Sequence, residues 1–152
     1  MTSRADVVAE LKRVNDSFSK YIKLNLAMGI TIVSVDDGRA KVHLPYRADL
    51  AGDSETGVLH GGAISTLMDT CCGMACFMGL PAVDSMATLD LRIDYLKPAT
   101  PGLDVVAEAE VLKATRSVVF VRGVAYHTDK NDPIASCAGS FMLGTPIGRS
   151  PK

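Results

Sequence analysis

One long apolar segment limits the possible folds of this chain more than any other feature of its sequence. Residues 58–83 carry a single formal charge, on Asp69. The apolar run closes at Gly79 with Pro81 beyond it, and this pattern predicts a central helix over residues 59–79. A membrane span is disfavoured, because a carboxylate in the middle of a bilayer costs about 2.5–3.5 kcal/mol. The rest of the chain must therefore bury a helix that is apolar on nearly every side.

Patterns on both sides of this helix predict the elements that cover it. Residues 1–25 contain an amphipathic helix, since apolar side chains recur there at helical spacing among charged ones. Alternating apolar and polar residues predict a hairpin and four further strands, over residues 30–46, 87–95, 103–112, 117–128 and 134–143. This order of elements indicates an α+β fold, in which a curved antiparallel sheet wraps around the central helix.

The strand over residues 87–95 has a regular alternation that predicts one apolar and one polar face. A strand of this kind is half buried, with its polar face toward solvent. The apolar face is expected to consist of Ala87, Leu89, Leu91, Ile93 and Tyr95, and the polar face of Thr88, Asp90, Arg92 and Asp94.

Length, charge and cysteine content narrow the function further. A chain of 152 residues is expected to form a single domain over residues 1–152. Its 16 basic and 17 acidic residues give a net charge of -1, which argues against a nucleic acid or an anionic membrane as partner. The four cysteines fit neither a disulfide framework nor a zinc site, so we interpret them as packing residues. The N-terminal residues lack the apolar core of a signal peptide, and we expect a cytoplasmic protein without metal or cofactor.

Two features of the central helix point to chemistry. His60-Gly61-Gly62 stands at its start, where free N–H groups can polarise a carbonyl and stabilise an oxyanion. An ordinary glycine-rich helix entry would have the same sequence. Asp69 favours the chemical interpretation, because a carboxylate is seldom buried without purpose. Asp69 could act as a nucleophile or general base, or be a structural residue bonded to neighbouring polar groups.

These two features cannot meet within one helix. Eight residues at 1.5 Å each separate Gly61 from Asp69 by about 12 Å, whereas both must lie near the same reacting carbon. A partner chain related by two-fold symmetry, with its helix antiparallel alongside, would bring its Asp69 to the first chain's Gly61. The spacing therefore predicts a homodimer with two equivalent sites.

The motif and its surroundings resemble a known family. Leu59-His60-Gly61-Gly62, then six residues and Asp69, with Leu89 to Pro98 and Gly102 downstream, is similar to the hotdog-fold acyl-CoA thioesterases of the phenylacetate-degradation type. The resemblance extends from about Leu26 to Leu143. It implies an enzyme that hydrolyses a thioester of coenzyme A, as a homodimer that often pairs into a tetramer.

The resemblance also implies roles for single residues. The Gly61 amide would polarise the thioester carbonyl, and Asp69 would act as base or nucleophile. His60 would shape the turn, and Thr88 would help to orient water. Ser54 departs from the family pattern, because relatives often carry Asn or a similar amide six positions before the histidine. That amide contacts the thioester or holds the acid.

Further residues are candidates for binding the substrate. Gly62 and Ser65 lie on the same polar stripe of the helix as the acid. The phosphates of coenzyme A call for basic residues, although each candidate could equally be an ordinary surface charge. The sequence does not identify the acyl group of the substrate, since aromatic, medium-chain and hydroxylated acids all suit an apolar cleft. The basic candidates are Arg92, Lys97, Lys113 and Arg116.

Two other functions compete with hydrolysis. A non-catalytic acyl-CoA or lipid-binding module could use the same cleft, with Asp69 as a structural anchor. Ser54, at the position of the family's amide, is the feature that best supports this alternative. A hotdog dehydratase fits less well, because the His-Asp or His-Glu arrangement with a proline-rich entry is missing. The sequence also lacks a G-x-S-x-G elbow, a P-loop and an H-E-x-x-H motif.

Overall fold

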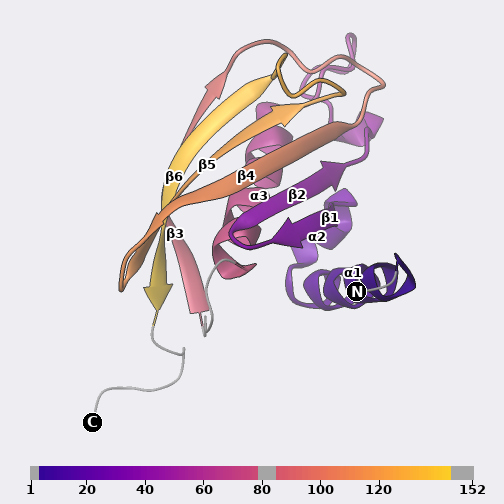
Figure 1. Ribbon diagram of the computed structural model, residues 1–152. Coiled ribbons are helices and arrows are strands. Elements are labelled where there is room, and N and C mark those ends of the chain that lie inside the picture. Colours follow the sequence, from indigo (N-terminus) through magenta and orange to yellow (C-terminus); the bar gives the residue numbers. More distant parts are fainter. Residues whose placement is uncertain (1–3, 79–84, 145–152) are drawn as a thin grey trace.

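A six-stranded antiparallel sheet and a long central helix dominate the structure, a computed structural model that describes residues 4–78 and 85–144 (Figure 1). The helices are α1 (Arg4–Tyr21), α2 (Lys23–Met28) and α3 (Gly61–Met78), with a short 3-10 helix at Ala48–Leu50. The strands are β1 (Thr31–Asp36), β2 (Arg39–Leu44), β3 (Ser85–Tyr95), β4 (Val105–Ala114), β5 (Val118–Tyr126) and β6 (Ala135–Gly144). Their order is β1-β2-β4-β5-β6-β3, and each neighbouring pair is antiparallel. The predicted α+β fold is confirmed.

The central helix α3 packs against β2, β4 and β5, on the inner face of the sheet (Figure 1). Fully burying a side chain the size of Leu or Val contributes about 1.5–3 kcal/mol, so this contact supplies much of the core. The predicted helix is confirmed with a start two residues later, while its predicted end at residue 79 lies outside the described residues. In the described ranges, no helix is both long and apolar enough to cross a membrane. The buried residues in this contact include Leu67, Met68, Cys71, Cys72 and Ala75 on the helix and Val42, Leu44, Val105, Val119 and Val121 on the sheet.

All four cysteines are free and buried. Burial raises the pKa of the Cys71 thiol, and it raises the pKa of Cys76 to about 12. A thiol that stays protonated at neutral pH is a poor nucleophile. All four cysteines belong to the hydrophobic core, which confirms their interpretation as packing residues.

The N-terminal helical segment consists of two helices rather than one. Ile22 separates α1 from α2, because its backbone is not helical (φ -111°, ψ 87°). Asn15 fastens α1 to the edge strand β1: its Nδ2 donates to the Ile32 carbonyl at 2.9 Å, and the Ile32 N–H donates to its Oδ1 at 2.7 Å. The side-chain amide of Asn15 thus pairs with the backbone of Ile32 on the free edge of β1, as the backbone of a neighbouring strand would.

Strand β3 departs from the predicted alternation. Its register with β6 shifts between Thr88 and Asp90, and a bulge of this kind changes which side chains share a face. Before the bulge, Met86 packs against the core and Thr88 contacts Asp69 on α3. After the bulge, Leu91 packs against the core. Thr88, expected on the polar face, is exposed, and its hydroxyl donates to Asp69 on α3. Leu89, expected on the buried face, is 51% exposed.

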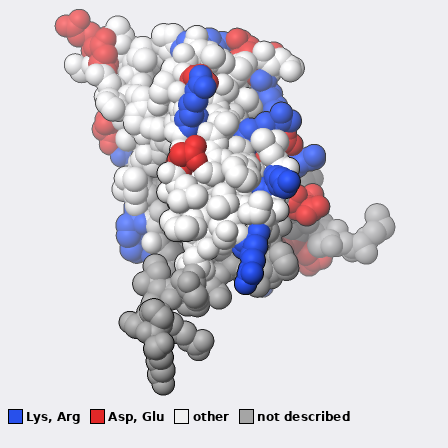
Figure 2. Space-filling view, turned by 90° about the vertical axis from the view of Figure 1, so that its left-hand side faces the viewer, with Lys and Arg blue, Asp and Glu red and all other residues white. Residues whose placement is uncertain are grey.

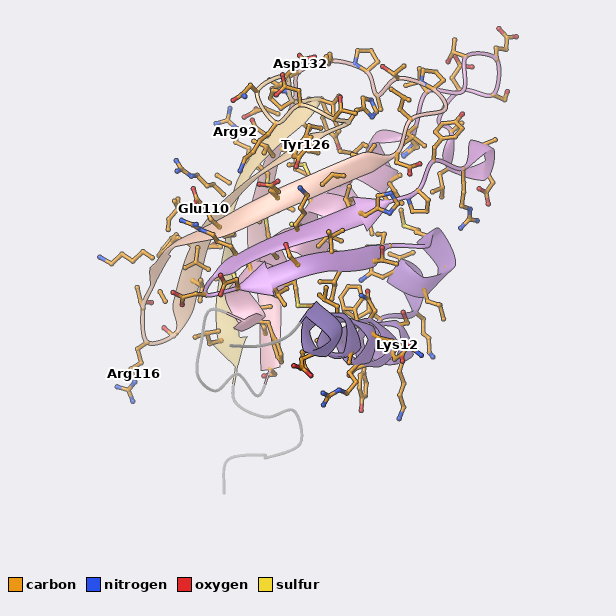
Figure 3. All side chains as sticks on the ribbon, turned by 45° about the vertical axis from the view of Figure 1, so that its right-hand side comes forward. Lys12, Arg92, Glu110, Arg116, Tyr126 and Asp132 are labelled. Carbon is orange, nitrogen blue, oxygen red and sulfur yellow. The ribbon has the colours of Figure 1, made fainter. Side chains whose placement is uncertain are left out.

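The outer face of the sheet carries a network of charges around Glu108. This carboxylate accepts hydrogen bonds from the Lys130 ammonium at 2.6 Å and from the Tyr126 hydroxyl, and it lies 3.2 Å from the Lys41 ammonium. Figure 3 shows Tyr126 and Glu110 on the same face. Partial burial raises the pKa of Glu108, but the hydrogen bonds from Lys130, Tyr126 and Lys41 outweigh it and lower the pKa to about 2.

This network predicts a loss of stability in acid. Because the folded pKa of Glu108 lies below the unfolded value of 4.5, its contribution is complete above that pH and disappears as the pH falls toward 2. With solvent screening, we expect about 1–2 kcal/mol from this group. Urea unfolding of Glu108→Gln between neutral pH and about pH 3 should show a flatter pH dependence than the wild type. The exposed Glu55→Gln variant is the control, and a slope in Glu108→Gln equal to that of Glu55→Gln would contradict the prediction.

Candidate active site

The loop before α3 fixes the turn from which the helix starts. Ala51 pairs with Leu59 in an isolated bridge, and the His60 N–H donates to the Leu50 carbonyl at 2.9 Å. The His60 ring then caps the helix, since its Nδ1 accepts the Gly62 N–H at 2.8 Å. The Gly62 amide is therefore occupied by the protein itself, which corrects the expectation that both glycine amides are free.

Gly61 presents the amide that remains open. Its N–H has no acceptor among the described residues, while its carbonyl accepts the Tyr95 hydroxyl at 2.8 Å. Gly61, Tyr95 and Lys97 line a cavity of about 490 Å³. An unpaired N–H at the positive end of a helix is suited to stabilise negative charge that develops on a carbonyl oxygen.

Asp69 lies two turns further along α3 and is half-buried, not fully buried as expected. Its Oδ1 accepts the Thr88 hydroxyl at 2.8 Å, so the bulge in β3 brings these two residues together. Its Oδ2 accepts no hydrogen bond from a described residue. Asp69 and Thr88 line a second cavity, of about 760 Å³. The carboxylate is thus held at one oxygen and open at the other, which suits a base or a nucleophile.

The two halves of the site do not meet within one chain. Gly61 lines the smaller cavity and Asp69 the larger one, and the two cavities share no lining residue. Both residues lie on the single helix α3, so the helical rise separates them by about 12 Å. One chain therefore offers an amide donor in one place and a carboxylate in another.

The four basic candidates lie in different places. Lys97 lines the cavity of Gly61 and pairs with Asp132, while Arg92 pairs with Asp94 at 3.0 Å. Lys113 belongs to the end of β4, and Arg116 extends from the turn after that strand, at a far tip of the molecule (Figure 3). Of these four residues, only Lys97 is near the predicted amide donor.

The two predicted serines differ in their surroundings. The Ser65 hydroxyl donates to the carbonyls of Gly61 and Gly62, at 3.0 and 3.2 Å, and so is engaged inside the helix. Ser54 is exposed in the loop before the helix and makes no hydrogen bond to another described residue. Within one chain, Ser54 therefore does not hold Asp69 as the family's amide would.

Two polar residues beside the site were not singled out from the sequence. Tyr95 was assigned only to the apolar face of its strand, yet its hydroxyl binds the Gly61 carbonyl. Asn25 is 2% exposed, and its Oδ1 accepts the hydroxyl of Thr70, the neighbour of Asp69. A lone amide between two leucines in an apolar stretch was the available signal for Asn25.

The fold and these residues together define a class of protein. A curved antiparallel sheet surrounds one apolar helix, which starts with an open amide and carries a carboxylate on its flank. This combination is that of a hotdog-fold thioesterase. Within the described ranges, no three His, Cys, Asp or Glu residues form a group that could hold a metal ion.

Comparison with known proteins agrees with this class. The chain belongs to the thioesterase superfamily, whose family model matches residues 56–134. It is 26% identical to the medium/long-chain acyl-CoA thioesterase YigI of Escherichia coli K12, with 88% of this chain and 94% of the relative covered. A crystal structure of a Pseudomonas aeruginosa protein is 42% identical, with a TM-score of 0.76 and 87% and 97% of the two chains covered. The PaaI protein of the Escherichia coli phenylacetic acid degradation operon shares the fold, at 21% identity and a TM-score of 0.76, with 86% and 91% covered. The chain is a thioester hydrolase, as its motif predicts.

Proposed function

We propose that this protein hydrolyses acyl-CoA thioesters at a site shared by two copies of the chain. Asp69 of one copy and the Gly61 amide of the partner subunit would face the same thioester carbonyl. The observation that carries the proposal is the separation of the two groups into different cavities of one chain. A two-fold axis between antiparallel α3 helices would unite each carboxylate with the other copy's amide.

The free edge of β3 supports such a dimer. β3 pairs with β6 on one side, and its other edge has no partner strand among the described residues. An exposed edge of eleven residues is a template for pairing with a second chain. Leu89, Tyr95 and Leu96 are each more than half exposed there. Figure 2 shows that this side of the molecule is largely uncharged, with a few acidic and basic side chains on it.

The chemistry follows from the two polar groups. Asp69 takes a proton from a water molecule, and the water oxygen bonds to the thioester carbon. The carbonyl oxygen becomes negative and is stabilised by the Gly61 N–H of the partner subunit. The carbon–sulfur bond then breaks, the thiolate of coenzyme A takes up the proton, and the acid is released. Direct attack by Asp69, which forms an anhydride that water then cleaves, requires the same charged carboxylate.

Other residues support these steps. Thr88 is a positioning residue, since its hydroxyl holds Oδ1 of Asp69 and leaves Oδ2 without a hydrogen bond from a described residue. His60 fixes the helix start. Lys97, the basic candidate that lines the cavity of Gly61, would meet a phosphate of coenzyme A. The acyl-CoA substrate is supported by the relative YigI, whose name gives it that activity. Four free thiols support the reducing cytoplasm as the location.

A panel of acyl-CoA substrates tests the proposed activity. The protein is incubated with each substrate and a thiol-reactive dye, and release of free coenzyme A should follow the enzyme concentration. Hydrolysis of at least one acyl-CoA supports the proposal. Thermal stabilisation by these compounds without thiol release would instead identify a binding module and overturn it.

A further inference from the structure

We propose that the larger cavity, between α1 and α3, binds the acyl part of the substrate as an extended aliphatic chain of medium or long length. This inference rests on the proposed function, because it takes Asp69 as the reacting group. Asp69 and Thr88 belong to the lining of this cavity. An acyl chain bonded to the carbon under attack must begin beside that carboxylate, so it can enter this cavity directly.

The lining is suited to an aliphatic chain. Apart from Asp69, its charged residues are Glu10 and Arg13, which pair with each other at 3.0 Å. Methionine side chains adapt to a flexible ligand, and burial of each methylene favours binding. The large apolar side chains that line it include Val14, Phe18, Met74, Phe77, Met86 and Phe141.

The shape of the cavity favours a chain over a ring. Along α1 the lining extends from Glu10 to Tyr21 at helical spacings of three and four residues, so one face of the helix forms a continuous wall. Eleven residues of helix correspond to about 16 Å. A single aromatic ring would fill only a fraction of the 760 Å³. An extended aliphatic chain can follow the wall for its whole length.

The wall is fixed in place and belongs to this chain's own N-terminal segment. Asn15 joins α1 to β1 through two hydrogen bonds to Ile32, so the helix has a defined position beside the cavity. α1 lies outside residues 56–134, the part of the chain that matches the family model. The acyl preference would therefore depend partly on α1, which lies outside the part of the chain that the family model matches.

Gly73 gives the sharpest test, because it lines the cavity one turn of α3 after Asp69. A Cβ atom there would lie 3.5 Å from Cε1 of Phe141 and 3.6 Å from Cε of Met86, which are ordinary contacts. Gly73→Ala should therefore fold well. Gly73→Leu has the same first carbon but must place its remaining atoms in the cavity.

A second obstruction comes from the opposite wall. Val14→Trp adds bulk on the side of α1 that lines the cavity. Lys12→Trp is the matched control, since Lys12 is exposed on the same helix, is not part of the lining and points away from the sheet (Figure 3). Thermal unfolding of all four variants establishes that each is folded before activity is compared.

The experiment measures kcat/KM for straight-chain substrates from acetyl-CoA to palmitoyl-CoA. In the wild type, kcat/KM should rise about threefold to fourfold per methylene until the cavity is filled. Gly73→Leu and Val14→Trp should lower the ratio of long-chain to short-chain kcat/KM at least tenfold, whereas Gly73→Ala and Lys12→Trp should change it little. A flat wild-type profile, or equal ratios in obstructed and control variants, would overturn the inference.

A binding measurement separates this inference from the proposed function. Absence of thiol release from every substrate would contradict the proposed function alone. The same variants are then titrated with alkyl-CoA thioethers, which cannot be hydrolysed. An affinity that increases with alkyl length in the wild type and is lost in Gly73→Leu supports the cavity as the acyl site. An affinity independent of length in the wild type overturns it.

Discussion

The Asp69→Asn variant is expected to lose on the order of a hundredfold or more in kcat, with little change in stability. Asparagine has the size of aspartate and still offers an oxygen to the Thr88 hydroxyl, which donates to Asp69 at 2.8 Å. The substitution removes the negative charge that either route to hydrolysis requires. Steady-state kinetics with the best acyl-CoA of the panel measures the loss.

The control for this prediction is another acid of the same chain. Asp16 is exposed on α1 and is not part of the lining of either cavity, so Asp16→Asn should retain wild-type turnover. Thermal unfolding of both variants shows whether their folds are intact. A folded Asp69→Asn enzyme with the turnover of Asp16→Asn would exclude Asp69 as base or nucleophile.

Gly61→Pro is expected to lower kcat by about a hundredfold to a thousandfold, the usual effect of removing one oxyanion donor. Proline has no N–H, and it is favoured at the first position of a helix, where Gly61 stands. Gly61→Ala is the matched control, because it keeps the N–H while adding a side chain. The added Cβ would lie 3.4 Å from the Tyr95 hydroxyl oxygen, an ordinary contact.

These two variants test whether Gly61 is needed as a hydrogen-bond donor or only as a small residue at the start of the helix. If the Gly61 N–H stabilises the oxyanion, Gly61→Ala should keep most of its activity and Gly61→Pro should not. Circular dichroism and thermal unfolding should give similar results for both. Equal kcat values for the folded Pro and Ala variants would show that the amide plays no part in the reaction.

Much of the fold could be predicted from the sequence because local patterns and tertiary structure agree. The apolar run around Asp69 can be stable only inside a sheet, and α3 is buried in this way. The turn between β1 and β2 is typical of Asp-Gly hairpins, with positive φ at Asp37 (31°) and Gly38 (75°). In both places the residue types alone determine the geometry.

The bulge in β3 could not be predicted from alternation within the strand, because its cause lies on β6. Gly139 stands opposite Leu91, and a Cβ on this glycine would lie 2.6 Å from the Asp90 carbonyl oxygen. The strands approach closely only because that atom is missing. A glycine inside a strand is a signal for a bulge, but it does not indicate which partner strand is affected.

The candidate site was partly predictable for the same reason. The shared site proposed for Gly61 and Asp69 follows from helix geometry, because the spacing along one helix keeps these two residues about 12 Å apart. The contact of Thr88 with the acid was not predicted, because the family resemblance implied only that Thr88 helps to orient water. Tyr95 and Asn25 act through long-range hydrogen bonds, which no local pattern reveals.

Complementation between two inactive variants tests the shared site most directly. Asp69→Asn and Gly61→Pro chains are co-expressed with different tags, and the activity of the mixture is compared with that of each variant alone. In a shared site, the mixed dimer keeps one intact pair, the acid of the Gly61→Pro chain with the amide of the Asp69→Asn chain. Random pairing should then restore about a quarter of wild-type activity. If mixed dimers form and activity stays at the level of the single variants, the two groups do not meet across a subunit interface.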